Sequence, residues 1–172
     1  MSARFGFTTK VSVELWRLAL PVLWIGLVGG IAFIKAPLKF HAPGITIPLG
    51  LGIGRLVFGA LNLAEAVILL AYTVLAFWPA AARLAGARLF GWLALLLLFV
   101  FKIAVVRPPL NARTDLVLSG ADPGQSPWHY IYIACDLLTL ILLLWLATRA
   151  ARSVRSAVAS LAQDQAPAAP SA

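Results

Sequence analysis

The chain has 172 residues, of which 62% are hydrophobic and 12% charged, and its mean hydropathy is +0.93. Soluble domains carry charge on roughly a quarter of their residues, and a water-soluble fold of this length could not bury so much apolar surface. The composition therefore excludes an ordinary soluble protein and indicates an integral membrane protein. The net charge of +8 does not indicate nucleic-acid binding, because the basic residues flank long apolar runs instead of forming a separate polar surface.

Cysteine content and length restrict the domain organisation. Cys135 is the only cysteine, which excludes an intramolecular disulfide and a multi-cysteine metal or iron–sulfur site. The first apolar segment is predicted to be a retained helix and not a signal peptide, because Glu14 and Arg17 interrupt it and no small-residue cleavage site follows closely. We predict one membrane domain over residues 1–162 and a disordered tail, rich in Ala and Pro, over residues 163–172.

Four apolar runs predict the fold class, which is an all-α, four-helix membrane bundle. A helix needs about 20 apolar residues to cross a hydrocarbon core of roughly 30 Å. The predicted spans cover residues 16–34, 56–78, 89–106 and 129–148. An even number of spans places the N- and C-termini on the same side of the membrane.

Glycine and proline mark the first span and two connectors. Gly26, Gly29 and Gly30 form a small-residue face that is predicted to allow close helix packing. Residues 36–55 contain several prolines and glycines but little charge, so this connector is predicted to lie in the interface or to fold back into the protein. A polar connector is predicted over residues 107–127, because prolines close the third span.

Aromatic and basic residues indicate an orientation. Four tryptophans fall at span ends on the side of the termini, as in an interfacial belt: Trp16, Trp78, Trp92 and Trp145. That side also has eight of the 14 lysines and arginines, which favours cytoplasmic termini. The prediction is a multi-pass protein in contact with membrane lipid, in a bacterial inner membrane.

Charged residues inside the spans indicate the candidate site, since each costs about 2.5–3.5 kcal/mol to insert and normally faces protein or a cavity. Glu65 lies about 15 Å along the second helix from Arg55, and Asp136 lies about 10 Å along the fourth from His129. Each carboxylate belongs to a polar helix face. These faces contain Arg55, Asn62, Glu65, Tyr72 and Thr73 in the second span, and His129, Tyr132, Asp136 and Thr139 in the fourth.

Both polar faces begin on the side opposite the termini and predict a pocket that opens there. The same side contains Lys35, Lys39, His41 and Lys102. Either the carboxylates bind a cation or relay protons, or they neutralise Lys102 and Lys35 or Arg55 and hold the bundle together. The predicted ligand- or ion-binding residues are Glu65, Asp136, Asn62, Arg55, Lys102, Lys35, His129 and Tyr132.

The two histidines raise a metal or haem alternative. His41 and His129 are both predicted on the pocket side, but His41 follows a proline-rich turn, and two histidines with one aspartate make an incomplete ligand set. Capped or interfacial histidines are therefore the favoured interpretation, and no cofactor is predicted. No nucleophile stands with a catalytic base, and Cys135 is predicted to be an inert buried thiol, so the prediction is a protein without enzymatic activity.

Two strings resemble a known family. FIKAPLKF at residues 33–40 and GRLVFGALN at residues 54–62 are similar to the transmembrane protein 205-like family of small four-helix membrane proteins. The resemblance covers roughly residues 15–148. It implies a four-span architecture. It implies no catalytic residues, because the biochemical function of that family is not established.

The leading functional prediction is a membrane protein that binds a small ligand or ion in the polar pocket and supports its transport or export. Four helices rarely enclose a complete alternating-access path, so a homo-oligomer or a partner membrane protein is expected. One alternative is a redox module that binds haem or a quinone. The other is a structural or assembly subunit of a membrane complex.

Overall fold

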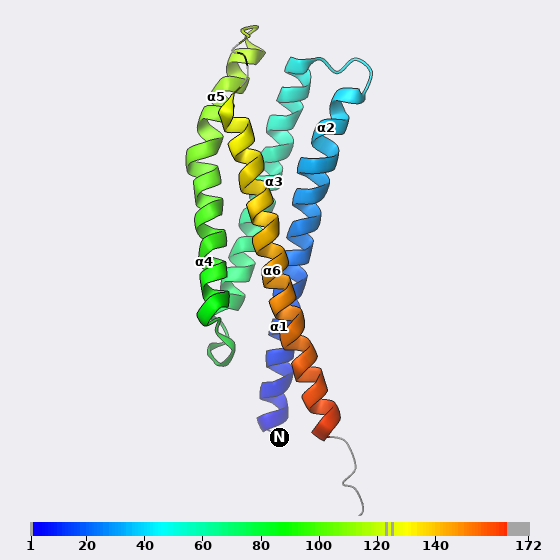
Figure 1. The fold of residues 1–172 in the computed structure, drawn as a ribbon, viewed down its shortest axis with the longest axis vertical. Helices are drawn as coiled ribbons and strands as arrows, with labels where there is room; N and C mark the ends of the chain where they lie inside the picture. The colour runs from blue at the N-terminus through cyan, green and yellow to red at the C-terminus, as the bar shows by residue number, and fades with distance from the viewer. Residues whose placement is uncertain (1, 123, 125, 165–172) are drawn as a thin grey trace, which may run out of the picture.

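The computed structural model describes residues 2–122, 124 and 126–164, and every regular element in these residues is helical (Figure 1). Four helical columns lie side by side, and each is long and apolar enough to cross a membrane. These segments are Lys10–His41, Ile47–Phe77, Gly86–Leu118 and Pro127–Ser160. The predicted all-α fold with four candidate membrane spans is confirmed.

Some columns contain several helical pieces in line. The first column consists of α1 (Ser2–Val28), the π-helical segment η1 (Gly29–Lys35), α2 (Ala36–Leu38) and the 3-10 turn η2 (Lys39–His41). The second column is α3 (Ile47–Phe77), and the 3-10 turn η3 (Ala80–Ala82) follows it. The third consists of α4 (Gly86–Phe101), the π-helical segment η4 (Lys102–Val106) and α5 (Arg107–Leu118), and the fourth is α6 (Pro127–Asp164).

Prolines explain both π-helical segments. A proline cannot donate to the carbonyl four residues earlier, and its ring clashes with that carbonyl. Pro37 follows η1 and Pro108-Pro109 follows η4, so in each case these carbonyls lie inside the π-helical segment. The wider π turn moves the preceding hydrogen bond by one residue, and the N–H of Arg107 donates to the carbonyl of Lys102. The helices therefore continue through their prolines.

This continuity corrects the two predicted connectors. Residues 36–41 extend the first column, and α3 begins at Ile47, where the Thr46 side chain accepts a hydrogen bond from the N–H of Leu49 at 3.4 Å. The element α5 occupies much of the predicted polar connector over residues 107–127. The rule that a proline ends a helix failed here because the π turns accommodate the prolines. In the predicted tail, residues 163–164 belong to α6, and residues 165–172 lie outside the described residues.

The distribution of charge and apolar surface fits lipid as the surrounding solvent. Large apolar side chains face outward, and Leu56 is 77% exposed while Phe90 is 71% exposed. Charged groups instead lie at the centre of the bundle, beside a core that includes Trp24, Leu61, Leu95, Leu143 and Leu146. Apolar side chains outside and charged side chains inside are stable in hydrocarbon but not in water. The positions of these side chains therefore support membrane insertion independently of helix length.

Close helix packing occurs at a different glycine from those predicted. A Cβ added at Gly26, Gly29 or Gly30 would meet nothing within 4 Å, so no other described helix approaches closely at these three positions. The buried residue Gly91 on α4 instead lies directly against the ring of Trp145 on α6, and an added Cβ would overlap that ring. The contact between α4 and α6 therefore depends on the missing side chain at Gly91.

Replacing Gly91 by alanine is expected to lower the free energy of unfolding by about 1–3 kcal/mol, because the new methyl group overpacks the α4–α6 contact. Unfolding in mixed detergent micelles, followed by circular dichroism, measures the change. Gly26→Ala is the matched control in another helix, and its open surroundings predict a change below about 1 kcal/mol. Equal stability of the two variants would contradict the close approach at Gly91.

Candidate functional site

Three charged side chains from three helical columns meet at the centre of the bundle. Lys102, the first residue of η4, donates to both carboxylate oxygens of Glu65 on α3 at 2.8 Å each, and to Oδ1 of Asp136 on α6 at 2.9 Å. The exposed fractions are 1% for Lys102, 0% for Glu65 and 2% for Asp136. We call these residues the charge triad. Their geometry matches the structural interpretation in which both carboxylates neutralise Lys102.

The charge triad has one carboxylate more than its single cation can neutralise. An ammonium has three donors, and the three contacts of Lys102 use all of them. Glu65 is further bonded by Trp24 on α1, whose Nε1 donates to Oε1 at 2.9 Å. Asp136 has a hydrogen bond to Lys102 at one oxygen only. With both carboxylates ionised the formal charge is −1, so a proton or a second cation is needed for neutrality.

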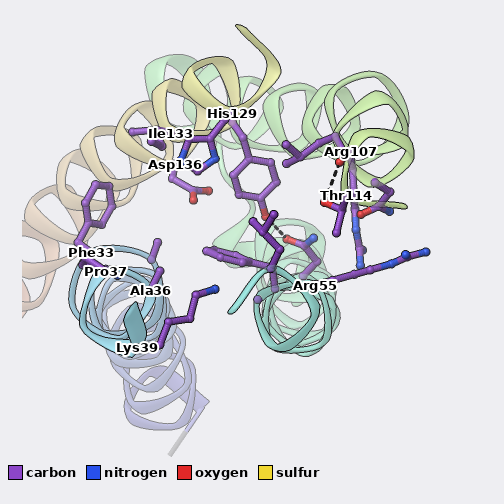
Figure 2. Close-up of a pocket in the computed structure, with 18 of the residues that line it drawn as sticks. Phe33, Ala36, Pro37, Lys39, Arg55, Arg107, Thr114, His129, Ile133 and Asp136 are labelled. Carbon is purple, nitrogen blue, oxygen red and sulfur yellow. Dashed lines mark hydrogen bonds between the residues drawn. The ribbon is translucent and has the colours of Figure 1, made fainter. Parts of the chain in front are cut away.

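A cavity of about 390 Å³ opens beside the charge triad, between α2, the first half of α3, α5 and the start of α6 (Figure 2). Much of its wall is apolar, formed by residues such as Phe33, Pro37, Phe40, Leu51, Phe58 and Leu110. Its polar residues include Lys39, Arg55, Asn62, Arg107, Thr114, His129, Tyr132 and Asp136. Asp136 belongs to both the cavity and the charge triad, and it connects them.

One buried hydrogen-bond donor in the cavity wall has no partner. The hydroxyl of Tyr132 donates to Oδ1 of Asn62 at 2.9 Å, but Nδ2 of Asn62 is buried without a hydrogen bond to any described residue. An unsatisfied buried donor costs about 1–3 kcal/mol. Because Asn62 lines the cavity, an acceptor oxygen of a bound molecule would remove this cost.

The cavity also has cations that lack carboxylate partners. Arg55 pairs with Asp115 at the rim, whereas neither Lys39 nor Arg107 forms an ion pair within the described chain. The ammonium of Lys39 lies directly over Gly54, where a Cβ would overlap it. The glycine thus makes room for this charge at the cavity wall. The cavity therefore has an excess of positive charge and favours an anionic group.

The structure places seven of the eight predicted binding residues in two adjoining sets. Glu65, Lys102 and Asp136 form the charge triad. Arg55, Asn62, His129 and Tyr132 line the cavity together with Asp136. Lys35 belongs to neither set. It does not line the cavity, and its buried Nζ has no hydrogen bond to any described residue. Pairing of Glu65 or Asp136 with Lys35 or Arg55, one of the predicted alternatives, is therefore not what the structure shows.

Three residues of the site do not stand out in the sequence as site residues. Trp24 has a recognisable signal, because it lies inside a span and not at its end, where interfacial tryptophans occur. The sequence predicts that Arg107 closes the third span. In the structure α5 continues the helix, and Arg107 lines the cavity. The sequence places Lys39 on the pocket side but within a connector, whereas the continued helix brings it to the cavity wall.

The histidines and the cysteine contribute little to the site. His41 is exposed and does not line the cavity, whereas His129 is exposed at its edge. No group of three or more His, Cys, Asp or Glu residues suited to a metal ion occurs among residues 2–122, 124 and 126–164. Cys135 is buried. The haem alternative thus has one cavity histidine, His129.

A second ion cluster lies at the end of the bundle opposite the cavity. Arg17 on α1 is 1% exposed, and its Nη1 donates to Oε1 of Glu14 at 2.7 Å. Its Nη2 donates to the backbone carbonyls of Leu75 and Ala82, which ties α1 to the end of α3 and to η3. Arg88 on α4 donates to Oε2 of Glu14 at 2.7 Å. This cluster joins three columns, although the sequence suggests only a basic flank at Arg17.

Comparison of the chain with family models, curated proteins and solved structures yields no match. The resemblance to the transmembrane protein 205-like family stays a prediction from residues 33–40 and 54–62. What the protein does must therefore be inferred from the charge triad and its cavity.

Proposed function

We propose that the protein binds a small amphipathic molecule with an anionic group in the cavity, and that it supports the transport or export of this molecule. The observation that carries the proposal is the free Nδ2 donor of Asn62 together with the unpaired cations Lys39 and Arg107 in a largely apolar wall. Such a combination of apolar walls with a few convergent polar groups is typical of ligand sites.

The cavity offers separate places for the two parts of such a ligand. A hydrocarbon part would lie against side chains such as Phe33, Phe40 and Phe58. The anionic group would accept hydrogen bonds from Lys39 and Arg107, and the guanidinium of Arg107 matches a carboxylate or phosphate in bidentate geometry. A carboxylate, phosphate or sulfonate on a short apolar chain is the chemical class that fits.

The charge triad would couple ligand binding to a proton or cation. Asp136 faces the cavity and has one oxygen without a hydrogen bond to Lys102. A proton or small cation that binds Asp136 would neutralise the extra negative charge and change the field in the cavity. This is the role in which Glu65 and Asp136 relay protons or hold a cation, with Lys102 as their permanent partner.

We also infer a setting for this activity. The setting that we propose is a bacterial inner membrane, in which the protein spans the bilayer several times, has both termini in the cytoplasm and has no enzymatic activity. The start of α1 and the end of α6 lie at the same end of the bundle, which supports termini on one side (Figure 1). The majority of basic residues predicted on that side is a further support. A second copy or a partner membrane protein would complete a path, because the cavity lies at one end of four helices.

A quinone-binding redox module is the second candidate, and the free donor of Asn62 favours it as well. A quinone carbonyl oxygen would accept from Nδ2 of Asn62, and the aromatic wall would hold the ring. A quinone needs no cation, so loss of Lys39 and Arg107 would leave its binding unchanged. In a structural or assembly subunit, which is the third reading, the charge triad would serve stability alone.

Decanoate is a suitable probe for the proposed site, with decyltrimethylammonium as its counterpart of opposite charge. We expect decanoate to raise the unfolding temperature of the protein in nanodiscs, and the double variant Lys39→Gln/Arg107→Gln to weaken decanoate binding by about tenfold or more, since charged hydrogen bonds contribute about 1.5–3 kcal/mol each. Differential scanning fluorimetry across a decanoate titration measures the effect.

Arg113→Gln provides the matched control for the double variant, because Arg113 lies on the same α5 helix but does not line the cavity. It should respond to decanoate as the parent does. Equal stabilisation of all variants, or equal stabilisation by the cationic probe, would contradict an anion site. Mass spectrometry of small molecules extracted from the purified protein would separate the candidates, since a bound quinone would favour the redox module.

A further inference from the structure

A second hollow, of about 460 Å³, lies far from the ligand cavity, where α4 begins and α6 carries its arginines. Three arginines and two serines line it: Arg88, Arg149, Arg152, Ser153 and Ser156. We call it the arginine hollow. None of these residues belongs to the charge triad or to the wall of the ligand cavity.

The arginine hollow has uncompensated positive charge. Arg88 is neutralised by Glu14, with Nη2 and Oε2 separated by 2.7 Å, but its buried Nε has no hydrogen-bond partner in the described chain. Arg149 lies over the ring of Trp145 at 5.4 Å. Neither Arg149 nor Arg152 forms an ion pair with a described residue. Two positive charges therefore remain in the hollow without a carboxylate.

Neutral donors in the arginine hollow complement these charges. The hydroxyl of Ser153 lies on the α6 side of the hollow, where it accepts a hydrogen bond from Nη1 of Arg88 at 3.4 Å and keeps its own proton to donate. The hydroxyl of Ser156 donates its proton to the carbonyl of Arg152 at 3.1 Å. On the α4 side, Ala85 provides no side-chain cap, and the first turn of α4 has no acidic residue. The backbone N–H groups of that turn are thus left without a side-chain partner. The arginine side chains, the Ser153 hydroxyl and the N-terminus of α4 together make a set of donors suited to phosphate oxygens.

The position of the arginine hollow indicates which phosphate it meets. Arg88 is the third residue of the candidate span Gly86–Leu118, so the hollow lies at the end of a membrane-spanning column. Nearby in the chain, Phe90 is 71% exposed and Leu144 is 59% exposed, which leaves apolar surface on the membrane side of the arginines. A phospholipid presents its phosphate at this level and its acyl chains alongside such apolar surface.

We propose that the arginine hollow binds the headgroup of an anionic phospholipid. Arg149 and Arg152 contact the phosphate, the Ser153 hydroxyl and the first turn of α4 donate to its remaining oxygens, and Arg88 borders the site from the α4 side. Bound in this way, the lipid joins α4 to α6 at the end of the bundle opposite the ligand cavity. This site is independent of the ligand cavity and of the function proposed for it.

The test is lipid retention by the full chain in nanodiscs of phosphatidylcholine that contain a rising share of phosphatidylglycerol. Native mass spectrometry after release should show phosphatidylglycerol retained on the parent protein in preference to phosphatidylcholine. The double variant Arg149→Gln/Arg152→Gln should require about tenfold more phosphatidylglycerol for the same occupancy, since each interfacial arginine contributes substantially to anionic-lipid binding. Retention equal to that of the parent would overturn the proposal.

Arg155→Gln is the matched control, because Arg155 is exposed on the same helix and does not line the hollow. It should retain phosphatidylglycerol as the parent does. An equal loss of lipid retention in both variants would show that general surface charge causes the effect, and would contradict a specific site in the arginine hollow. If the double variant does not fold, the single variant Arg152→Gln, at an exposed position, gives the same comparison.

Competition with inorganic phosphate distinguishes a site for a lipid headgroup from a site for a free anion. Millimolar phosphate in neutral nanodiscs should leave the unfolding temperature unchanged, and it should not displace phosphatidylglycerol from the parent. Displacement of the lipid by inorganic phosphate would identify a site for the free anion and would overturn the lipid assignment.

Discussion

Replacing Lys102 by methionine is expected to lower the free energy of unfolding by about 3–5 kcal/mol, because the substitution leaves Glu65 and Asp136 buried without their cation. Glu65 would keep only the N–H of Trp24, and Asp136 would lose its hydrogen bond to the ammonium. Methionine has a volume similar to that of lysine and no charge. The expected loss of free energy of unfolding therefore comes from the unpaired carboxylates and not from a large cavity. Titration with denaturing detergent, followed by circular dichroism, measures it.

Two further variants give this prediction its controls. Lys10→Met removes a lysine that is exposed on α1, and its effect should stay within about 0.5 kcal/mol. The triple variant Lys102→Met/Glu65→Gln/Asp136→Asn removes all three charges and should recover much of the stability lost in the single variant, since a buried ion group adds little net stability over neutral side chains. A Lys102→Met protein as stable as Lys10→Met would contradict the charge triad.

Replacing Arg17 by methionine should have the second largest effect, with a loss of about 3 kcal/mol in the free energy of unfolding. The guanidinium is almost fully buried, and it satisfies the carbonyls of Leu75 and Ala82 in addition to Glu14. Glu14 would keep Arg88 as its partner, so the expected loss is smaller than that for Lys102→Met. The same detergent titration measures the change.

The effect of Arg17→Met should be local as well as large. Hydrogen–deuterium exchange is expected to rise at the end of α3 and in η3, where Arg17 binds two carbonyls, and to stay unchanged around the charge triad. Arg83→Met is the matched control, because Arg83 lies beside η3 but is exposed. Similar exchange in the two variants would show that Arg17 does not hold this end of the bundle.

The charge triad and the cavity assign different roles to the two carboxylates. Glu65 has hydrogen bonds from Lys102 and Trp24 and does not line the cavity, which suits a structural anchor. Asp136 has fewer hydrogen bonds and faces the cavity, which suits a group that exchanges a proton or cation. The sequence treats them as equivalent, because both are single acids inside apolar spans.

Much of the fold follows from the sequence alone. Length, hydropathy and the spacing of apolar runs determine four helical columns, because a chain with so little charge must satisfy its backbone internally in lipid. The same physics places Glu65 and Asp136 inside the bundle, since an unpaired charge that faces hydrocarbon is too costly. A shared cavity for the residues near Arg55 and His129 is also predictable, because their polar faces begin at the same end.

Only the tertiary structure decided which groups meet. The pairing of both carboxylates with Lys102, the burial of Arg17 and the open surroundings of Gly26 all depend on which helix faces come together. The polar faces in the sequence do not determine which helices are neighbours. The π turns before Pro37 and Pro108-Pro109 determined where the residues of the two predicted connectors lie. By carrying the helices through their prolines, they brought residues expected in connectors to the cavity wall, a consequence of backbone hydrogen bonding that apolar spacing does not encode.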